Sequence, residues 1–500
     1  MTVHFFLKDL LDIILFLGKI MMKPEYYPCE PAHLWEHFYR ITQIPRPSKG
    51  EAEVRKYVIS CAEDNGCDWV TDSEGNLIVR VPGSKNYEHK STLIIQNHLD
   101  MVTVKQSDKQ HDFENDPLKL KITDGWLYAD RTTLGADNGL GCAAALALMT
   151  DQNVSNPPLE LLFTVDEETG LGGAMKLDSD LLTGTRLLNL DTEDWNELFI
   201  GCTGGAGWKI SSNSDLCEEE LDDTFRLSIS GLSGGHSGIQ IHEQLGNSIK
   251  LACQYLLSID DVRLGYFDAG IAHNVIAREA EVVFSTSNAT YEALNKRLIE
   301  LSDGWIEYLP STDRGLVCKL TPAERILGLD KIDSARILNL IATFPHGAIS
   351  YSTSSQKDLV DLSVNLSSVR LSDGDFLLEA SYRFFRESQT LPLQQTITSL
   401  CNAFDMKCYS EAGYPGWDPD RNSELLAHGV DLHSRMFNFE PEIKAIHAGL
   451  ECGILKGKMP NVDMLSFGPT IKGAHSPQEG LEIATVEPFW RYLTSFVEEL

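Results

Sequence analysis

Three features that would assign this 500-residue sequence to a particular protein class are missing: a CxxC pair, an excess of basic residues, and an uncharged apolar segment at the N-terminus. Its eleven cysteines are odd in number and widely scattered. Disulfide scaffolds use regularly spaced, even sets, and many zinc or redox sites use CxxC. The cysteine pattern therefore favours a reduced, cytoplasmic protein without a structural zinc site.

Basic residues are scarce relative to acidic ones. The chain has 42 Lys and Arg against 73 Asp and Glu, which gives a formal net charge of −31. Phosphate backbones are bound by basic patches, so this balance argues against a nucleic-acid partner. It suits cationic ligands, and it equally suits simple solubility.

The apolar N-terminal segment, residues 1–22, does not have the pattern of a membrane anchor. Four charged residues interrupt it: Lys8, Asp9, Asp12 and Lys19. A membrane-spanning helix needs ~20 mostly uncharged residues, and a signal peptide needs an early basic region and a cleavage site. We expect no stable membrane insertion. The segment is interpreted as an amphipathic extension or as residues upstream of a start at Met21 or Met22, with a peripheral membrane helix as the alternative.

A chain of this length is expected to form two or three domains. In residues 23–205, expected helices alternate with short apolar strands, as at 92–96, 139–150, 159–165 and 186–189. This alternation predicts an α/β fold with a mostly parallel sheet covered by helices. We expect residues 416–500 to complete that domain.

The intervening region, residues 206–415, has a different pattern. Expected strands at 225–229, 275–285 and 315–320 alternate with helices at 247–257 and 291–309. A similar order follows in a hairpin over 360–385, a helix at 393–404 and a strand at 406–410. The pattern predicts an inserted α+β lid domain made of two related halves.

Five clusters of acidic residues or histidine lie at the ends of expected strands or in the following loops. They are residues 94–100, 133–141, 164–170, 189–193 and 473–477. In parallel α/β sheets, sites form at the carboxyl ends of the strands. Each cluster alone also has an ordinary structural explanation, such as a surface pair, a helix cap or an acidic turn.

The chemistry of these clusters points to metal. His98 and Asp100 stand two apart and project to the same side, and a ligating imidazole needs a carboxylate on its other nitrogen. The run Asp166, Glu167 and Glu168 is costly near a buried strand end unless cations or a shared proton offset it. Together the clusters offer a mixed nitrogen and oxygen ligand set that suits Zn²⁺, Mn²⁺ or Co²⁺.

The ordered strings HLD, GADNG, DEETG, NLDTE, GGHSG, NVIARE and AHSP resemble the M20 family of dinuclear metallopeptidases. The longer strings GADNGLG, GYPGW, HAGLECG and FGPTIKGAHSP look most like its aminoacyl-histidine dipeptidase branch, also called peptidase D or Xaa-His dipeptidase. The resemblance covers residues 30–500 and says nothing about residues 1–22. It implies a dinuclear zinc peptidase-like catalytic domain with a lid.

The resemblance implies a pair of divalent cations, with Zn²⁺ first and Mn²⁺ or Co²⁺ as alternatives. It assigns five metal ligands: His98, Asp137, Glu168, Asp191 and His475. Asp137 would bridge the two ions, Glu167 would act as general base on a bridging water, and Asp100 would orient His98. The family also implies a cis peptide between Asp137 and Asn138.

In the lid, the resemblance gives His236 the role of stabilising the oxyanion. Asn274 and Arg386 match the groups that bind the substrate carboxylate, although Arg383 is the alternative to Arg386. Simple family members carry one lid half and donate such groups across a dimer. A homodimer is therefore one expectation, and whether His236 acts in its own chain or in a partner stays open.

The implied activity is hydrolysis of short peptide substrates, first of all Xaa-His dipeptides. Another activity of the same family is the alternative: a tripeptidase, a general dipeptidase or an N-acyl amino acid deacylase. Residues 231–235 also satisfy GxSxG, which raises a serine hydrolase as a rival. A catalytically inactive scaffold is a further alternative, but none of the expected ligands or the base is missing.

Overall fold

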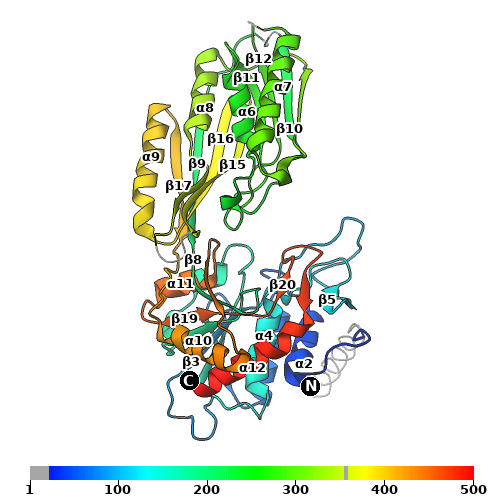
Figure 1. Ribbon diagram of the computed structural model, residues 1–500, viewed down its shortest axis with the longest axis vertical. Coiled ribbons are helices and arrows are strands. Elements are labelled where there is room, and N and C mark those ends of the chain that lie inside the picture. The colour runs from blue at the N-terminus through cyan, green and yellow to red at the C-terminus, as the bar shows by residue number, and fades with distance from the viewer. Residues whose placement is uncertain (1–21, 220, 222, 288, 354–357) are drawn as a thin grey trace, which may run out of the picture. The chain divides into compact units, whose positions relative to one another are not determined.

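The computed structural model describes residues 22–500 except 220, 222, 288 and 354–357 (Figure 1). The interpretation of residues 1–21 thus falls outside the described residues. The described chain forms two compact units. Unit 1 takes the residues up to Gly201 together with Pro419–Ala445 and Leu450–Leu500, and unit 2 takes Cys202–Asp418 and Ile446–Gly449. The short segment Ile446–Gly449 was not part of the expected insertion.

Unit 1 is built on an eight-stranded sheet. Its order is β1 (Asp68–Thr71), β2 (Leu77–Val81), β6 (Leu159–Thr164), β3 (Leu93–His98), β7 (Arg186–Asn189), β19 (Asp463–Ser466), β8 (Glu197–Cys202) and β18 (Glu442–Ile446). The pairs β6–β3, β3–β7 and β7–β19 are parallel, whereas β1–β2, β2–β6 and β19–β8 are antiparallel. The predicted parallel sheet is confirmed at its centre, and antiparallel pairs extend it on both sides.

Helices cover this sheet, and β3 and β6 are therefore buried along their whole lengths. The helices are α2 (Ala32–Thr42), α3 (Ala52–Asp64), α4 (Ala136–Thr150), α5 (Gly172–Lys176), α10 (Glu424–Phe437), α11 (Glu451–Lys458) and α12 (Ile483–Glu499). A small separate sheet has the order β20 (Ile471–Lys472), β21 (Gly480–Glu482), β5 (Trp126–Ala129) and β4 (Leu120–Thr123). Continuous burial of the two central strands is the property expected of a parallel sheet covered on both faces.

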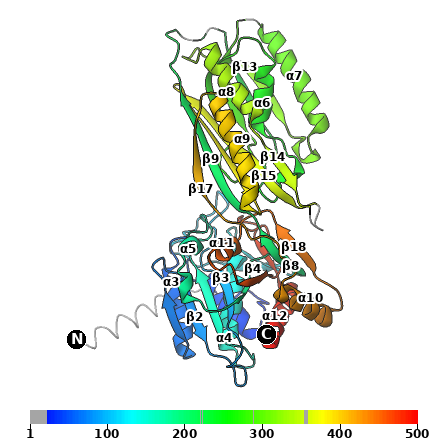
Figure 2. The same ribbon diagram turned by 90° about the vertical axis from the view of Figure 1, so that its left-hand side faces the viewer.

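Among its described residues, unit 2 contains one nine-stranded sheet, and helices lie on one face of it (Figure 2). Its strand order is β13 (Val317–Pro322), β10 (Thr224–Ser230), β12 (Ala280–Ser285), β11 (Arg263–Ala269), β15 (Val360–Ser372), β16 (Asp375–Phe384), β9 (Gly204–Asn213) and β17 (Lys407–Tyr414), and β14 (Gly347–Tyr351) pairs with β15. The helices are α6 (Ser248–Leu257), α7 (Tyr291–Tyr308), α8 (Lys331–Thr343) and α9 (Thr390–Ala403). Burial alternates along β16, so its other face is more open.

The two halves of unit 2 share one topology. The first runs β10, α6, β11, β12, α7, β13, and the second runs β9, α8, β15, β16, α9, β17, with β14 added. In both, the fourth strand neighbours the first, then come the third and the second. The halves meet through the antiparallel pair β11–β15. The predicted related halves are therefore two βαββαβ modules, and the first is inserted after the first strand of the second.

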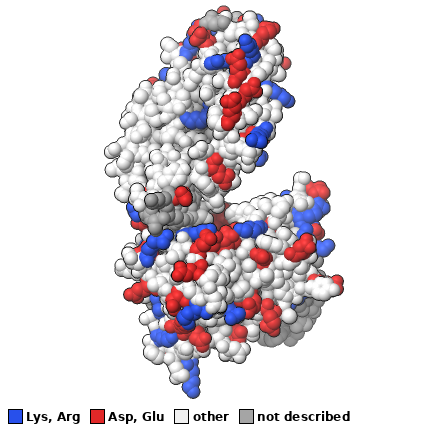
Figure 3. All heavy atoms as spheres, viewed as in Figure 1, with Lys and Arg blue, Asp and Glu red and all other residues white. Residues whose placement is uncertain are grey.

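The expected strand at 275–285 is wrong in its first five residues, since β12 begins at Ala280 and β11 was missed. All eleven cysteines lie in the described part of the chain, and none is joined in a disulfide. No helix among the described residues is long and apolar enough to cross a membrane. On the face shown in Figure 3, basic side chains stand among acidic ones.

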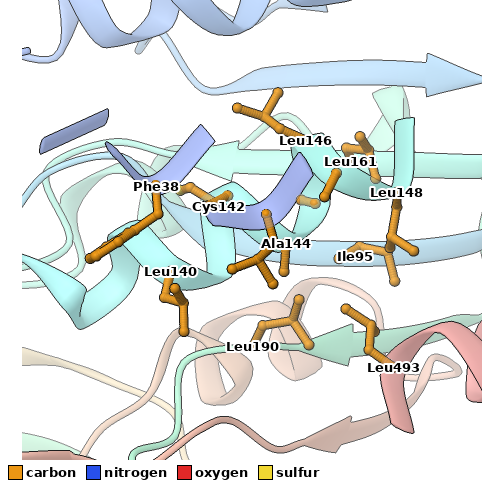
Figure 4. Packing of buried hydrophobic residues seen from close by; sticks show 14 of the residues in the cluster. Phe38, Ile95, Leu140, Cys142, Ala144, Leu146, Leu148, Leu161, Leu190 and Leu493 are labelled. Carbon is orange, nitrogen blue, oxygen red and sulfur yellow. The ribbon is translucent and has the colours of Figure 1, made fainter. Parts of the chain in front are cut away.

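The main core of unit 1 forms around α4. Leu140, Ala144 and Leu148 of this helix pack with Phe38 of α2 and Ile95 of β3 (Figure 4). All five side chains are almost completely buried. This packing fixes α4 against the central strand β3.

Candidate metal centre

The candidate metal centre lies at the carboxyl ends of adjacent parallel strands of unit 1. His98 is the last residue of β3, Glu167 and Glu168 come shortly after β6, and Asp191 follows β7 by two residues. Because β6, β3 and β7 are neighbours in that order, their carboxyl ends lie at one edge. Sites of parallel α/β sheets form at this edge.

Asp137 and His475 come to the same place from loops. Asp137 lies in the non-helical first turn of α4, and the peptide bond between Asp137 and Asn138 is cis. This confirms the cis bond that the family resemblance implies. His475 lies in the loop between β20 and β21 and has a φ of +61°.

Asp137 stands between the two histidines. Its Oδ1 is 3.0 Å from His98 Nε2, and its Oδ2 is 3.1 Å from His475 Nε2. His98 Nε2 is also 3.3 Å from Asp191 Oδ1, and His475 Nε2 is 3.0 Å from Glu168 Oε2. The five predicted ligands thus converge as two groups of three that share Asp137.

These residues fit a pair of divalent cations. In each group the possible ligand atoms lie within 4.8 Å of one another. Glu168 Oε1 is buried without a hydrogen-bond partner among the described residues. Buried carboxylate oxygens are costly unless paired. A shared carboxylate with an imidazole and a further carboxylate on each side is a ligand set that divalent metals such as zinc accept.

Asp100 has the contacts expected of a group that orients His98. Its Oδ1 is 3.4 Å from His98 Nδ1, and its Oδ2 accepts a hydrogen bond of 2.7 Å from the Ser48 hydroxyl. It also accepts hydrogen bonds from the backbone N–H groups of Glu167 and Glu168, each 3.1 Å long. Burial opposes ionisation, but His98 and these donors lower the pKa of Asp100 to about 2. The ionised carboxylate therefore links the imidazole to the loop after β6.

The site is short of positive charge. Burial raises the pKa of Asp191 to about 6, although His98 opposes the rise. Burial also raises the pKa of Glu167, with His98 opposing and Glu168 reinforcing the effect. Hydrogen bonds to Asp137 and Glu168 raise the pKa of His475 to about 11. Protons are held where the carboxylates lack counter-charge, and two dications would supply that charge.

The predicted lid residues belong to unit 2. His236 Nδ1 accepts hydrogen bonds from the N–H groups of Gly238 (3.2 Å) and Ile239 (3.0 Å). In the neutral imidazole the proton is then on Nε2, which makes Nε2 a donor. The backbone of Ser237 donates to the carbonyl of Asn274 at 2.9 Å, so His236 and Asn274 lie on paired segments.

The two candidate arginines differ in their contacts. Arg386 Nε donates to Asp418 Oδ2 at 2.9 Å, and its side chain is 56% exposed. Arg383 lies on the more open face of β16, and one of its terminal nitrogens donates to the Tyr414 hydroxyl at 3.2 Å. Its Nε is buried and has no hydrogen-bond partner among the described residues. Arg383 therefore retains unused hydrogen-bonding capacity, whereas Arg386 already has a carboxylate partner.

The geometry contradicts the serine hydrolase alternative. The Ser233 hydroxyl donates to Asp313 Oδ1 at 2.6 Å, and the Ser233 N–H donates to the same atom at 2.7 Å. A nucleophile elbow joins a strand to a helix, whereas this loop leads from β10 towards a single 3₁₀ turn at Ile241–Glu243. Ser233 is thus bound by a carboxylate that fixes the loop.

Sequence reasoning missed three buried charged residues around the site: Arg46, Glu451 and Glu479. Glu451 Oε2 accepts hydrogen bonds from Gln96 and Thr164, each 2.6 Å long, and burial raises the pKa of Glu451 to about 8. For the two glutamates the sequence contains positional signals only: Glu451 lies in the string HAGLECG, and Glu479 lies four residues after His475.

Comparison with known proteins agrees with this geometry. The chain is 35% identical over 477 residues to the cytosol non-specific dipeptidase of Escherichia coli, covering 94% of this chain and 98% of the relative. It resembles the crystal structure of aminoacylhistidine dipeptidase from Vibrio alginolyticus with a TM-score of 0.80 and 32% identity, over 94% of this chain and 97% of that one. Aminopeptidase PepT from Bacillus cereus shares the fold, with a TM-score of 0.53 and 15% identity over 93% and 98% of the two chains. Residues 94–499 match the description of peptidase family M20/M25/M40, and the chain therefore belongs to that family.

Proposed function

We propose that this M20 dipeptidase prefers Xaa-His dipeptides and cleaves them at a pair of divalent cations, Zn²⁺ first and Mn²⁺ or Co²⁺ as alternatives. The observation that carries the proposal is the pair of ligand groups sharing Asp137. The Vibrio alginolyticus enzyme is named for aminoacyl-histidine, which supports the preference. The Escherichia coli relative is named non-specific, which makes a general dipeptidase the second candidate.

In this proposal His98, Asp191, Glu168 and His475 hold the two cations, and Asp137 is shared. When bound, the cations would act as Lewis acids on water and on the scissile carbonyl. Asp100 keeps the His98 ring oriented.

Glu167 removes the proton from the attacking water and delivers it to the leaving amine. Burial raises the pKa of Glu167, and a raised pKa is a common property of carboxylates that transfer protons. No covalent intermediate with the enzyme is needed.

The lid supplies the remaining groups. The Nε2 proton of His236 would be donated in a hydrogen bond to the carbonyl oxygen as negative charge develops there. Asn274 and an arginine would bind the substrate carboxylate. Arg386 is the residue that the motif suggests, and the unpartnered Nε of Arg383 favours the alternative. The proposal holds whether His236 acts in its own chain or across a homodimer.

We place the enzyme in the cytoplasm. The eleven cysteines without a disulfide and the word cytosol in the name of the Escherichia coli relative support this location.

The test is a substrate panel combined with metal removal. β-Alanyl-histidine, alanyl-histidine, alanyl-alanine, a tripeptide and an N-acetylated amino acid are assayed before and after complete chelation, then after adding back Zn²⁺, Mn²⁺ or Co²⁺. We expect the highest kcat/KM with the histidine dipeptides and complete loss of activity without metal. Equal rates on alanyl-alanine indicate the general dipeptidase, preference for the acetylated substrate indicates a deacylase, and activity that survives metal removal refutes the metal-dependent mechanism.

A further inference from the structure

A buried carboxylate holds the segment that leads to Asp137. Glu479 is 2% exposed. Its Oε2 accepts hydrogen bonds from the backbone N–H groups of Leu134 (2.7 Å) and Gly135 (2.9 Å), and its Oε1 accepts from Ala136 (2.7 Å) and Asp137 (3.3 Å). Four consecutive N–H groups thus point at one carboxylate, and the last of them belongs to Asp137, the shared ligand of the proposal.

The same carboxylate belongs to the loop of a second ligand. His475 and Glu479 both lie between β20, which ends at Lys472, and β21, which begins at Gly480. The N–H of Glu479 donates to the carbonyl of Ser476 at 3.0 Å, which closes a turn within this loop. The position of His475 is therefore tied to that of Asp137 through Glu479.

Arg46 holds the other side of the segment. Its guanidinium is buried and donates to the carbonyls of Leu99 (2.8 Å) and Asp100 (2.6 Å) and to that of Gly135. A Cβ at Gly135 would lie 2.5 Å from an Arg46 nitrogen. Glycine there, which also has a φ of +65°, leaves room for the guanidinium. The end of β3, which carries His98, is thus joined to the segment before Asp137.

We propose that Glu479 is a positioning residue that fixes Asp137 and His475 relative to each other for binding of the cation pair, and that Arg46 ties this arrangement to the end of β3. The inference rests on the proposed metal pair. Groups that orient metal ligands typically change metal affinity about 10–100-fold when they are replaced. Glu479 lies in the loop that carries His475, and it accepts four backbone hydrogen bonds from the segment that ends at Asp137.

Glu479→Gln tests the proposal, because one oxygen is replaced by an amide NH₂ that faces backbone N–H groups and cannot accept from them. Glu160→Gln is the matched control. Glu160 is also 2% exposed and also accepts backbone N–H groups, from Thr183 (3.0 and 2.9 Å) and Gly184 (3.0 Å). It lies at the start of β6, at the end of the strand away from Glu167.

The readouts are the dissociation constants of Zn²⁺ measured by competition with a chromophoric chelator, the visible spectrum of the Co²⁺-loaded protein, and the unfolding free energy of the metal-free protein. We expect Glu479→Gln to weaken Zn²⁺ binding at least tenfold and to change the Co²⁺ spectrum. Glu160→Gln should keep both properties while it loses stability.

The inference is overturned if the Zn²⁺ dissociation constant of Glu479→Gln lies within threefold of that of the original protein and the variant loses as much stability as the control. If Glu479→Gln does not fold, Glu479→Asp decides: weaker Zn²⁺ binding supports the positioning role, and unchanged binding refutes it. The original protein is measured first. Failure of that protein to bind two Zn²⁺ ions would refute the proposed function itself, whereas normal binding by both proteins would refute only the role of Glu479.

Discussion

Among single residues, Glu167 is the one whose proposed role, proton transfer, can be tested separately from metal binding. Its backbone N–H is held by Asp100, and its carboxyl group is the predicted base. We expect Glu167→Gln to retain two metal ions and to lower kcat by about 10²–10⁴-fold, because the amide cannot accept the proton from water. Steady-state kinetics and metal analysis of the same preparation measure both effects.

Glu168→Gln is the matched variant for this experiment. Glu168 is adjacent in sequence, but it belongs to the ligand group with His475. This change should reduce the metal content as well as the rate. Near-normal turnover of Glu167→Gln with full metal content would show that another group takes the proton.

His37 makes the stability of unit 1 depend on pH. It is buried, with Nδ1 2.8 Å from the Tyr57 hydroxyl and Nε2 2.9 Å from the Thr150 hydroxyl. Burial lowers the pKa of His37 to about 4, whereas an unfolded histidine titrates near pH 6.5. The contribution to stability is therefore complete above about pH 6.5 and is lost as the pH falls toward 4, because the unfolded chain binds the proton more tightly.

The change that tests this is His37→Gln. From pH 7.5 to 5, the unfolding free energy of the original protein should fall by about 2 kcal/mol more than that of the variant. Denaturant unfolding at both pH values measures the difference, and other titrating groups cancel because both proteins contain them. An equal fall in both proteins would contradict the assignment.

At the level of secondary structure, sequence patterns predicted the strands that lead to three of the proposed ligands. β3, β6 and β7 are short apolar runs, and each was expected within a few residues of its observed bounds. β9 was missed because it begins with glycines, which are depleted in strands. A Cβ at Gly204 would lie 2.5 Å from the Tyr414 carbonyl oxygen, so the close approach of β17 requires glycine at this position.

α8 was missed, and the second module was recognised only in part, for a topological reason. The first strand of that module, β9, is separated from α8 by the whole first module. The N-cap of α8, Asp330, which accepts a hydrogen bond from the N–H of Asp333 at 2.8 Å, was a local signal that went unused. Arg46 and Glu479 could not be predicted, because their partners are backbone groups distant in sequence.

The small residues of α4 allow a close approach that a single methyl group should disturb. A Cβ at Gly141 would lie 2.3 Å from the side-chain amide of Asn97 and 2.7 Å from the Leu190 carbonyl oxygen. We expect Gly141→Ala to destabilise unit 1 by about 1–3 kcal/mol through overpacking. Denaturant unfolding measures this change.

Gly304→Ala is the control for helix propensity. Gly304 is in α7, and apart from its chain neighbours and the backbone of that helix no heavy atom of the described residues lies within 4 Å of a Cβ built there. This substitution should stabilise unit 2 by about 0.5–1 kcal/mol, because alanine is the better helix former. If Gly141→Ala stabilised the protein instead, the prediction of overpacking would be wrong, because the neighbouring atoms would have moved to accommodate the methyl group.

For the whole molecule, the dominant electrostatic property is the net charge of −31. Self-repulsion of a highly charged chain destabilises its compact state, and salt screens it. With metal kept saturating, we expect the Tm to rise by a few degrees as the ionic strength increases from about 0.02 to 0.2 M. Sodium chloride and choline chloride should give the same rise, and a falling Tm would contradict the electrostatic explanation.

The order of strands also has a consequence for synthesis on the ribosome. In the sheet of unit 1, β19 lies between β7 and β8, although it follows them in the chain by more than 250 residues. This sheet therefore stays incomplete until residue 466 of the nascent chain has emerged. The last of the proposed metal ligands in the sequence, His475, emerges later still. A growing polypeptide thus cannot bring the five proposed metal ligands together before nearly all of it has been translated.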